Sequence, residues 1–226
     1  LPHADTEKEL MTQDATDAAA QDTVTRLRAE VTQCDPGTLR LLLTEARTHN
    51  GWQDRPVEDS LLRELYEIMR WGPTSGNSFP ARVFFLKTAQ SKASLEAALK
   101  PNNLEKTRAA PVTAIIAHDT AFWEHAEKMF PHNPAVQLAF KDNTAGAEIT
   151  AFRNGTLQGA YFLIAARAVG LDCGPMSGFD NGVVDDAFFA GTTLRSNFLC
   201  NLGYGNISKV MKRLPRLEFD EACKIL

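Results

Sequence analysis

The chain has 226 residues, of which 44% are hydrophobic and 23% charged, values typical of soluble globular proteins. This length suits one large domain or two small ones. There are 24 basic and 28 acidic side chains, so the formal charge is −4. We expect no nucleic-acid partner, because such a partner is usually met by a basic surface. We also expect no membrane partner, because no apolar run reaches the roughly 20 residues that span a bilayer.

The N-terminal stretch and the cysteines favour a reducing compartment. Residues 1–20 lack the basic start and the apolar stretch of an export signal. The four cysteines are widely scattered and include no CxxC pair: Cys34, Cys173, Cys200 and Cys223. Such spacing is not that of a disulfide framework, which secreted proteins of small size often need. We therefore expect a cytoplasmic protein.

A polar extension is expected before the main domain. Residues 1–36 carry few large apolar groups, and 22–31 favour a marginal helix. Pro36-Gly37 ends this segment. Residues 37–226 contain no internal repeat and no low-complexity linker, so we expect them to form one domain.

The first half of this domain alternates helices with a strand. Thr38 is a candidate cap for a helix that runs to Ala46, and Gly72-Pro73 ends a second helix that begins near Glu58. The apolar residues of both segments recur at helical spacing. The next expected elements are a loop over 74–80, a strand over 82–87 and a short helix over 91–99.

The second half contains the most apolar segments. Residues 112–117 predict a central strand, and residues 148–169 predict a long helix that is buried on most sides. Strands that alternate with helices indicate a mixed α/β fold. The other expected elements are a turn at 101–103, helix and loop over 119–146, strands at 171–175 and 197–202, a helix from Asp180 to Phe188, a basic tail over 209–216 and a short helix from Asp220.

Three familiar site motifs do not fit. Residues 203–208 begin like GxGxxG but lead into a basic tail, so we do not expect a Rossmann dinucleotide site. A nucleophile elbow would need its serine one residue before Ser177. Histidines recur every seven residues at His118, His125 and His132, but they fall on different predicted elements. We therefore expect scattered histidines and no metal site.

What remains is a set of polar loops rich in glycine and proline. Arg47–Asn50, Pro73–Asn77 and Pro175–Gly178 offer hydroxyls, amides and backbone N–H groups, and cations gather in Lys209–Arg216. These groups suit a planar, phosphorylated ligand, because cations bind phosphate and backbone donors meet ring edges. The alternative is that the loops are ordinary turns and the tail is a solvated face.

The order of these loops resembles that of the FMN-dependent nitroreductase superfamily, over roughly residues 38–226. The resemblance implies an α+β fold with a central, mainly antiparallel sheet flanked by helices. It also implies an intertwined homodimer with FMN at the interface. Five stretches resemble a narrower subgroup, the malonic semialdehyde reductases of pyrimidine degradation: ARTHNGW (46–52), WGPTSGN (71–77), PMSGFD (175–180), DDAFFAG (185–191) and RLPRL (213–217).

The resemblance further implies which residues meet the cofactor. The residues implied to bind FMN are Arg47, Thr48, His49, Pro73, Thr74, Ser75, Asn77, Pro175, Ser177, Gly178 and Arg216. Those of the 73–77 loop are implied to reach the flavin of the opposite subunit. Asn103 and Lys106 are implied to approach the flavin ring and the incoming nicotinamide or substrate. The chain departs from the common pattern at Ser177, which replaces an acidic residue.

The implied activity is that of a flavin-dependent oxidoreductase with NADH or NADPH as donor, between which the sequence does not distinguish. The predicted reaction reduces malonic semialdehyde to 3-hydroxypropionate by ping-pong hydride transfer, so no catalytic side chain is expected. Lys106 is predicted to hold the substrate carboxylate. The alternatives are a nitroaromatic or quinone reductase of the same fold and a non-catalytic flavin-binding module.

Overall fold

The computed structural model describes residues 3–226, with side chains from residue 17 onward. The first two residues of the predicted extension lie outside the described residues. The chain divides into two units, one ending at Thr44 and one beginning at Glu45, and each is described by itself. The first unit contains the helices α1 (His3–Glu30) and α2 (Pro36–Leu39) and the π-helical turn η1 (Arg40–Thr44).

The first unit contains more helix than the sequence predicts. Helix α1 covers 3–30 and not only 22–31, because no glycine or proline interrupts that stretch. The predicted cap at Thr38 is wrong. Asp35 caps α2, and its Oδ1 accepts a hydrogen bond from the Thr38 N–H at 3.0 Å. The helix begins early because Pro36 suits the first helical position, where its missing N–H has no partner to lose.

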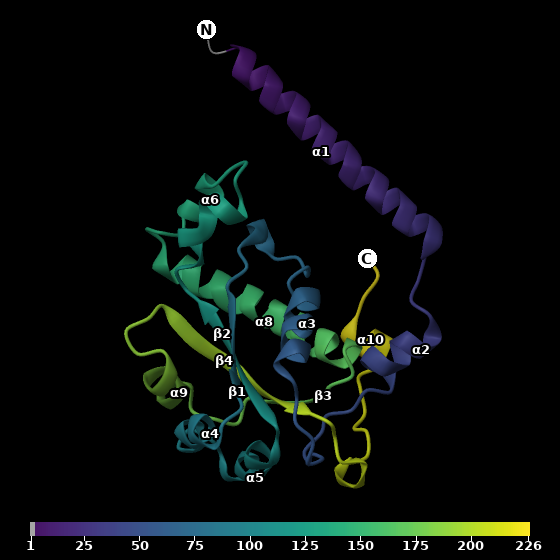
Figure 1. Ribbon diagram of the computed structural model, residues 1–226, viewed down its shortest axis with the longest axis vertical. Helices are drawn as coiled ribbons and strands as arrows, with labels where there is room; N and C mark the ends of the chain where they lie inside the picture. The colour runs from purple at the N-terminus through teal and green to yellow at the C-terminus, as the bar shows by residue number, and fades with distance from the viewer. Residues whose placement is uncertain (1–2) are drawn as a thin grey trace. The chain divides into compact units, whose positions relative to one another are not determined.

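Within the described residues, the second unit is built on one four-stranded sheet, visible in Figure 1. The spatial order is β1-β2-β4-β3, and every neighbouring pair is antiparallel. This confirms the predicted α+β class with a central antiparallel sheet. The strands are β1 (Ala81–Leu86), β2 (Val112–Asp119), β3 (Asp172–Met176) and β4 (Leu194–Gly203).

Helices and helical turns connect and cover these strands. The predicted turn at 101–103 is wrong, because Pro101 opens a helix, again at its first position. The last strand begins three residues earlier than predicted, at Leu194. The helical elements are α3 (Asp59–Met69), η2 (Ser75–Asn77), α4 (Ala89–Glu96), α5 (Pro101–Ala109), η3 (Phe122–His125), α6 (Ala126–Met129), α7 (Ala135–Leu138), α8 (Thr144–Ala168), α9 (Asn181–Phe188), η4 (Ile207–Lys209) and α10 (Phe219–Ala222).

Both faces of the sheet are covered, and β2 supplies apolar side chains to each. Alternate residues of a strand point to opposite faces. Val112 and Ile116 therefore join a core formed with α3 and α8, whereas Ile115 joins a second core formed with α4 and α9. All eight residues of β2 are buried. Full burial on both faces explains why this segment reads as a continuous apolar run in the sequence.

Helix α8 approaches β2 closely at a glycine. A Cβ added to Gly155 would lie 2.8 Å from the Cβ of His118, which is buried in β2. The structure confirms the predicted long helix, which begins at Thr144 because the Asn143 side chain accepts a hydrogen bond from the Gly146 N–H at 3.0 Å. The small residues of α8 thus set the spacing between helix and sheet.

Gly155→Ala is expected to lower the free energy of unfolding by about 1–3 kcal/mol, because the new methyl group overpacks against the rigid Cβ of His118. In an unconstrained helix the same change would stabilise by about 1 kcal/mol. Denaturant titration measures the difference. Arg153→Ala, on the exposed side of α8, is the control and should change stability by less than about 0.5 kcal/mol. A stabilised Gly155→Ala protein would show that helix and sheet are not in contact there.

Candidate functional site

The first group of predicted site residues lies along the outer edge of β3. Thr48 forms a parallel bridge with Cys173, and the His49 N–H donates to the Cys173 carbonyl at 2.9 Å. The His49 ring is buried, with its Nε2 3.2 Å from Asp172 Oδ1. The Gly205 N–H donates to the other oxygen of Asp172 at 2.7 Å. One carboxylate therefore fixes both the imidazole and the turn after β4.

The second ring nitrogen of His49 has no partner. Its Nδ1 is buried and makes no hydrogen bond with the described residues. Gly205 lies directly against the imidazole, where any Cβ would overlap the ring. Buried polar nitrogens are almost always hydrogen-bonded in folded proteins, so an orphan of this kind indicates a group that the protein itself does not supply. His49 is thus a candidate ligand contact.

Helix α5 brings its two predicted residues to the same region. The Asn103 side-chain amide donates to the Gly178 carbonyl at 2.8 Å, which ties α5 to the end of β3. Lys106 is half-buried, and its Nζ donates to Asn50 Oδ1 at 3.2 Å. Burial lowers the pKa of the Lys106 ammonium below its ordinary value. Pro175 lies within β3, and the exposed Ser177 follows directly after the strand.

A buried amide that the sequence analysis missed holds α5 in place. Asn201 in β4 is fully buried, and its Nδ2 donates to the Lys106 carbonyl at 3.2 Å. The Trp52 indole donates to the same carbonyl at 3.0 Å. Thr113 completes the set by donating its hydroxyl to Asn201 Oδ1 at 2.8 Å. The available signal was a polar amide inside an apolar strand, because a buried amide must have partners.

The second group of predicted residues lies on the loop before β1. The Ser75 N–H donates to Asn154 Oδ1 of α8 at 2.9 Å, and the Asn77 amide donates to the Met129 carbonyl of α6 at 2.6 Å. The Tyr161 hydroxyl donates to the Pro73 carbonyl at 3.0 Å. Asn77 has a φ of 49°, an uncommon conformation for a residue other than glycine. Together with the Gln137 amide, which donates to the Gly76 carbonyl at 2.7 Å, these contacts hold the loop in shape.

Thr74 and Phe79 determine the backbone conformation at the end of the loop before β1. The Thr74 hydroxyl oxygen accepts a hydrogen bond from the Phe79 N–H at 3.1 Å. Phe79 has a φ of 44°, which for a bulky side chain is a strained conformation. The bond from Phe79 to Thr74 stabilises this conformation. Strained residues of this type concentrate at binding sites, where the surrounding structure holds them in place.

The structure does not bring the two groups of predicted residues together. Ala81, which follows the loop, pairs with His118, whereas Cys173 beside Thr48 lies at the level of Val112, six residues along β2. Thr48 and β1 are also four strand positions apart. Strand spacings of about 4.8 Å and rises of about 3.3 Å per residue place the groups roughly 25–30 Å apart. One small ligand cannot contact both within one chain.

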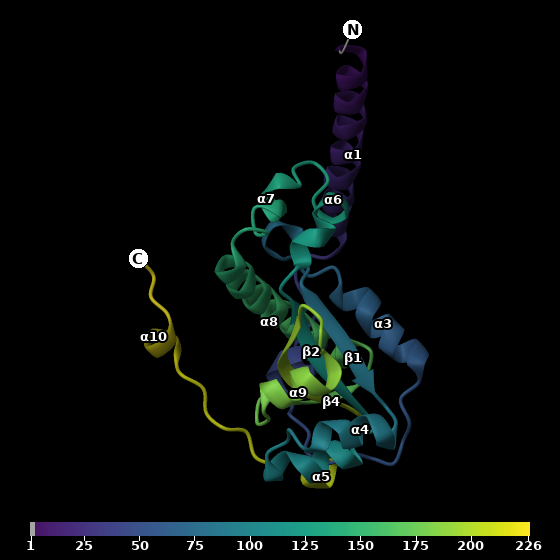
Figure 2. The same cartoon turned by 90° about the vertical axis from the view of Figure 1, so that its left-hand side faces the viewer.

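The C-terminal segment meets the first group through backbone carbonyls. Arg47 donates to the Met211 carbonyl, and Arg213 donates to the Ala46 carbonyl at 3.1 Å. The predicted phosphate contact Arg216 donates to carbonyls within its own turn at 3.0 and 3.1 Å. Every residue from 211 to 226 is exposed, and Figure 2 shows this segment running away from the sheet. The tail therefore carries its cations without covering the site.

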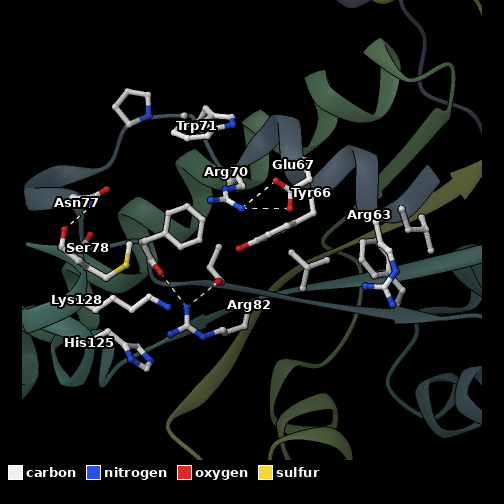
Figure 3. A pocket seen from close by; sticks show the side chains of 18 of the residues that line it. Arg63, Tyr66, Glu67, Arg70, Trp71, Asn77, Ser78, Arg82, His125 and Lys128 are labelled. Carbon is white, nitrogen blue, oxygen red and sulfur yellow. Dashed lines mark hydrogen bonds and ion pairs between the residues drawn. The ribbon is translucent and has the colours of Figure 1, made fainter. Parts of the chain in front are cut away.

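A groove lies between α3, β1 and the loop before β1, shown in Figure 3. Its volume is about 1160 Å³, and Pro73 and Asn77 of the second group belong to its lining. Trp71 at its rim is 77% exposed, an unusual amount for so large an apolar side chain. The groove was not predicted from the sequence, because its walls come from segments about 70 residues apart.

The three histidines considered as metal ligands lie on different elements. His118 is buried in β2, His125 ends η3, and His132 is in the loop before α7. Burial lowers the pKa of His118. Among the described residues, no three His, Cys, Asp or Glu side chains are grouped to hold a metal ion. No helix in that part of the chain has the length and apolar character needed to cross a bilayer.

Comparison with a known family agrees with this geometry. The model of the nitroreductase family matches residues 43–204, more than two thirds of the chain. The chain belongs to the nitroreductase family. The match includes both groups of loop residues and all four strands, but it stops before the exposed C-terminal segment and begins after α1 and α2.

Solved structures share the nitroreductase fold at low sequence identity. A provisionally assigned nitroreductase from Bacillus subtilis is 18% identical with a TM-score of 0.77, covering 85% of this chain and 100% of its own. One from Exiguobacterium sibiricum, solved in complex with FMN, is 15% identical with a TM-score of 0.76, covering 86% and 99%. A provisionally assigned NAD(P)H:FMN oxidoreductase from Staphylococcus epidermidis is 16% identical with a TM-score of 0.71, covering 86% and 98%.

Asp172→Ala removes the acceptor that His49 and Gly205 share. We expect the free energy of unfolding to fall by about 1–2 kcal/mol, the value of a modestly exposed hydrogen-bond pair. The Gly205 amide should also exchange its hydrogen faster, which NMR can follow. Asp172→Asn keeps an acceptor oxygen and should restore most of the loss. Unchanged exchange at Gly205 in the alanine variant would contradict the role assigned to this carboxylate.

Proposed function

We propose that this nitroreductase-family protein is an FMN-dependent NAD(P)H oxidoreductase that reduces malonic semialdehyde to 3-hydroxypropionate. The observation that carries the proposal is the environment of His49, where a buried ring nitrogen without a partner lies against glycine backbone. The FMN complex of the Exiguobacterium protein supports the choice of cofactor. The name of the Staphylococcus protein supports a nicotinamide as electron donor.

The residues along β3 fit one part of a flavin. His49 offers an unsatisfied nitrogen, and Gly178 carries no Cβ, which lets the Asn103 amide approach the backbone here, because a Cβ would lie 2.6 Å from Asn103 Nδ2. Arg47 is half-exposed and supplies a cation at the same edge. In the proposed site these three residues hold FMN together with Thr48, Pro175 and Ser177. Arg216 lies on the exposed tail, and in the proposed site it binds the phosphate of FMN when the tail folds against the cofactor.

The chain's own contribution to the reaction is charge and position. When bound, FMN would supply the hydride chemistry that links the reduced nicotinamide to the acceptor. Lys106 stabilises negative charge at the ring, because its half-buried ammonium lies in a region of reduced solvent screening. Asn103 orients the backbone at Gly178 and so fixes the ring edge. Asn201 and Trp52 hold the Lys106 backbone in place.

We further propose that the active form is an intertwined homodimer. The loop over 73–77 lies too far from His49 to reach the same flavin within one chain, so it would serve the flavin of a second copy. Apolar side chains without cover support such a partner. In α8, Ile149 and Phe152 are 58% and 54% exposed, and in the tail Leu214 and Leu217 are 67% and 69% exposed.

The acceptor is the least constrained part of the proposal. The subgroup motifs favour a small aldehyde with a carboxylate, and the chain offers Lys106 as a cation for it. A nitroaromatic or quinone acceptor is the alternative within the same family. A non-catalytic flavin-binding module is the second alternative. A panel of acceptors distinguishes these three possibilities.

The purified protein is expected to be yellow and to release free FMN into the supernatant after acid precipitation. No covalent attachment is expected, because flavin is held by hydrogen bonds and charge in the proposed site. Reduced nicotinamide should bleach the colour, and malonic semialdehyde should restore it faster than a neutral quinone or a nitroaromatic does. A protein that is colourless and does not bind added FMN would contradict the flavin proposal. Bleaching without turnover of any acceptor would favour the binding module.

Complementation between two inactive variants tests the shared site. Arg47→Ala impairs one group of residues, and Asn77→Ala impairs the other. When the two proteins are mixed after subunit exchange, half of the dimers are mixed and each has one intact site. The mixture should recover about a quarter of the wild-type activity, by the symmetry of such a dimer.

The matched control mixes Arg47→Ala with His49→Ala, two variants of the same group. This mixture should stay inactive. In a mixed dimer, one site carries Arg47→Ala and the other carries His49→Ala. In a pure dimer, both sites carry the same substitution. Sedimentation of the wild-type protein gives an independent measurement. A folded, flavin-bound monomer at micromolar concentration would exclude the dimer.

A further inference from the structure

One end of the groove in Figure 3 carries a lysine, Lys128, that no carboxylate of the groove lining balances. Five basic side chains and two carboxylates line the groove, although the chain as a whole has a formal charge of −4. Both carboxylates are already paired, Glu67 with Arg70 at 3.0 Å and Asp59 with Lys87 at 2.5 Å. Of the three cations that remain, Arg63 lies at the far end of the groove, Arg82 is paired with Asp119 outside the lining, and Lys128 lies at the loop end.

Two cations face each other at that end. Arg82 is fixed, because it donates to Asp119 and to the carbonyls of Phe79 and Ala81, each at 3.0 Å. No hydrogen bond or ion pair joins the side-chain ammonium of Lys128, on α6, to any described residue. In Figure 3 its side chain runs into the groove, with the ammonium turned toward Arg82. The Asp119 carboxylate already balances Arg82, so an anion between the two side chains would be attracted chiefly by the charge of Lys128.

A buried hydroxyl without a partner lies at the same place. Ser78 lines the groove, is only 3% exposed, and its Oγ makes no hydrogen bond with the described residues. Buried hydroxyls nearly always have partners, so this one indicates a missing acceptor or donor. A hydroxyl can donate to an oxyanion while the neighbouring cations balance its charge.

The wall that carries Lys128 is held in position. The Asn77 amide donates to the Met129 carbonyl at 2.6 Å, which joins α6 to the loop. His125, one turn before Lys128, also lines the groove and adds a second nitrogen-bearing side chain. The acidic residues of the same segment, Glu124 and Glu127, are not part of the lining. The segment therefore presents its basic side to the groove.

We propose that Ser78, Arg82 and Lys128 form an oxyanion site that binds the charged group of one of the two reactants. The ligand is a carboxylate, carried by the acceptor, or the 2′-phosphate carried by NADPH. Both offer several acceptor oxygens to an ammonium, a guanidinium and a hydroxyl. The site is separate from Lys106, which lies in the other group of residues beside Asn50. If the acceptor's carboxylate binds at the oxyanion site, Lys106 stabilises charge at the ring and does not hold that carboxylate.

This inference rests on the proposed function, since it assigns the site to a reactant of that enzyme. The oxyanion site lies beside the loop over 73–77, which the proposed dimer places at the partner's flavin. A reactant held there by its charged group would extend its other end toward the ring. Lys106 and the oxyanion site would then approach one active site from two subunits.

The experiment compares Lys128→Gln and Ser78→Ala with the wild-type full-length protein. Lys141→Gln, an exposed lysine outside the groove, is the matched control. Calorimetric titration with malonate and with inorganic phosphate measures the oxyanion site directly and needs no activity. Steady-state assays then give KM for malonic semialdehyde, for a neutral quinone, and for NADH and NADPH. Circular dichroism checks that each variant is folded.

We expect Lys128→Gln to weaken oxyanion binding by about tenfold, the value of a lost charge-assisted hydrogen bond in a partly exposed groove. Ser78→Ala should act in the same direction and less strongly. If the acceptor's carboxylate is the ligand, KM for malonic semialdehyde rises and KM for the quinone does not. If the 2′-phosphate is the ligand, KM for NADPH rises and KM for NADH does not.

Two results would overturn the oxyanion site. One is that neither anion binds the wild-type protein, and the other is that Lys128→Gln and Lys141→Gln affect binding and KM equally. Failure of the proposed function gives a different pattern. The protein would then lack flavin-dependent turnover, while malonate or phosphate binding would still depend on Lys128. If the enzyme is active and Lys128→Gln changes neither anion binding nor KM, the proposed function holds and the oxyanion site is excluded.

Discussion

Strand β2 is buried on both faces and hydrogen-bonded along both edges, and this position decides where the candidate site residues lie. Because neither face can be given to solvent, helices must cover each one. The α8 side holds the loop before β1 through Asn154, and the opposite side holds α5 through Asn201. Ligand-facing residues are thus attached at the two ends of the same buried sheet.

A few hydrogen bonds within these layers fix the positions of the segments that carry the site residues. The Ala81 N–H at the start of β1 donates to Gln158 of α8 at 2.8 Å, in a buried environment. A buried N–H without an acceptor is destabilising, so Gln158 fixes where the strand begins and where the loop ends. Asp172 does the same for the turn after β4. Each tie joins residues that are far apart in sequence.

Some charged side chains are paired within the chain, and others remain available to a ligand. Arg108 is held by Glu96 and Glu105 at the surface, and Arg82 is held by Asp119. The exposed Arg108 pairs leave little charge for a ligand, whereas the Asp119 pair holds Arg82 in place on the side of the groove that Lys128 faces. Lys128 has no such partner among the described residues, and the buried His49 Nδ1 lacks one as well. We place ligand contacts where pairing within the chain is incomplete.

The sequence by itself determined the mixed α+β class, the apolar strand β2, the long helix α8 and the loops that resemble nitroreductases, because periodicity and turn chemistry are local. It did not determine the helix that opens at Pro101 or the cap at Asp35, where one proline outweighs neighbouring turn formers. Only the tertiary structure separated the loop over 73–77 from His49 and placed Ser78 and Lys128 along one groove. Those relations depend on strand order and helix packing, which join distant segments and leave no local pattern in the chain.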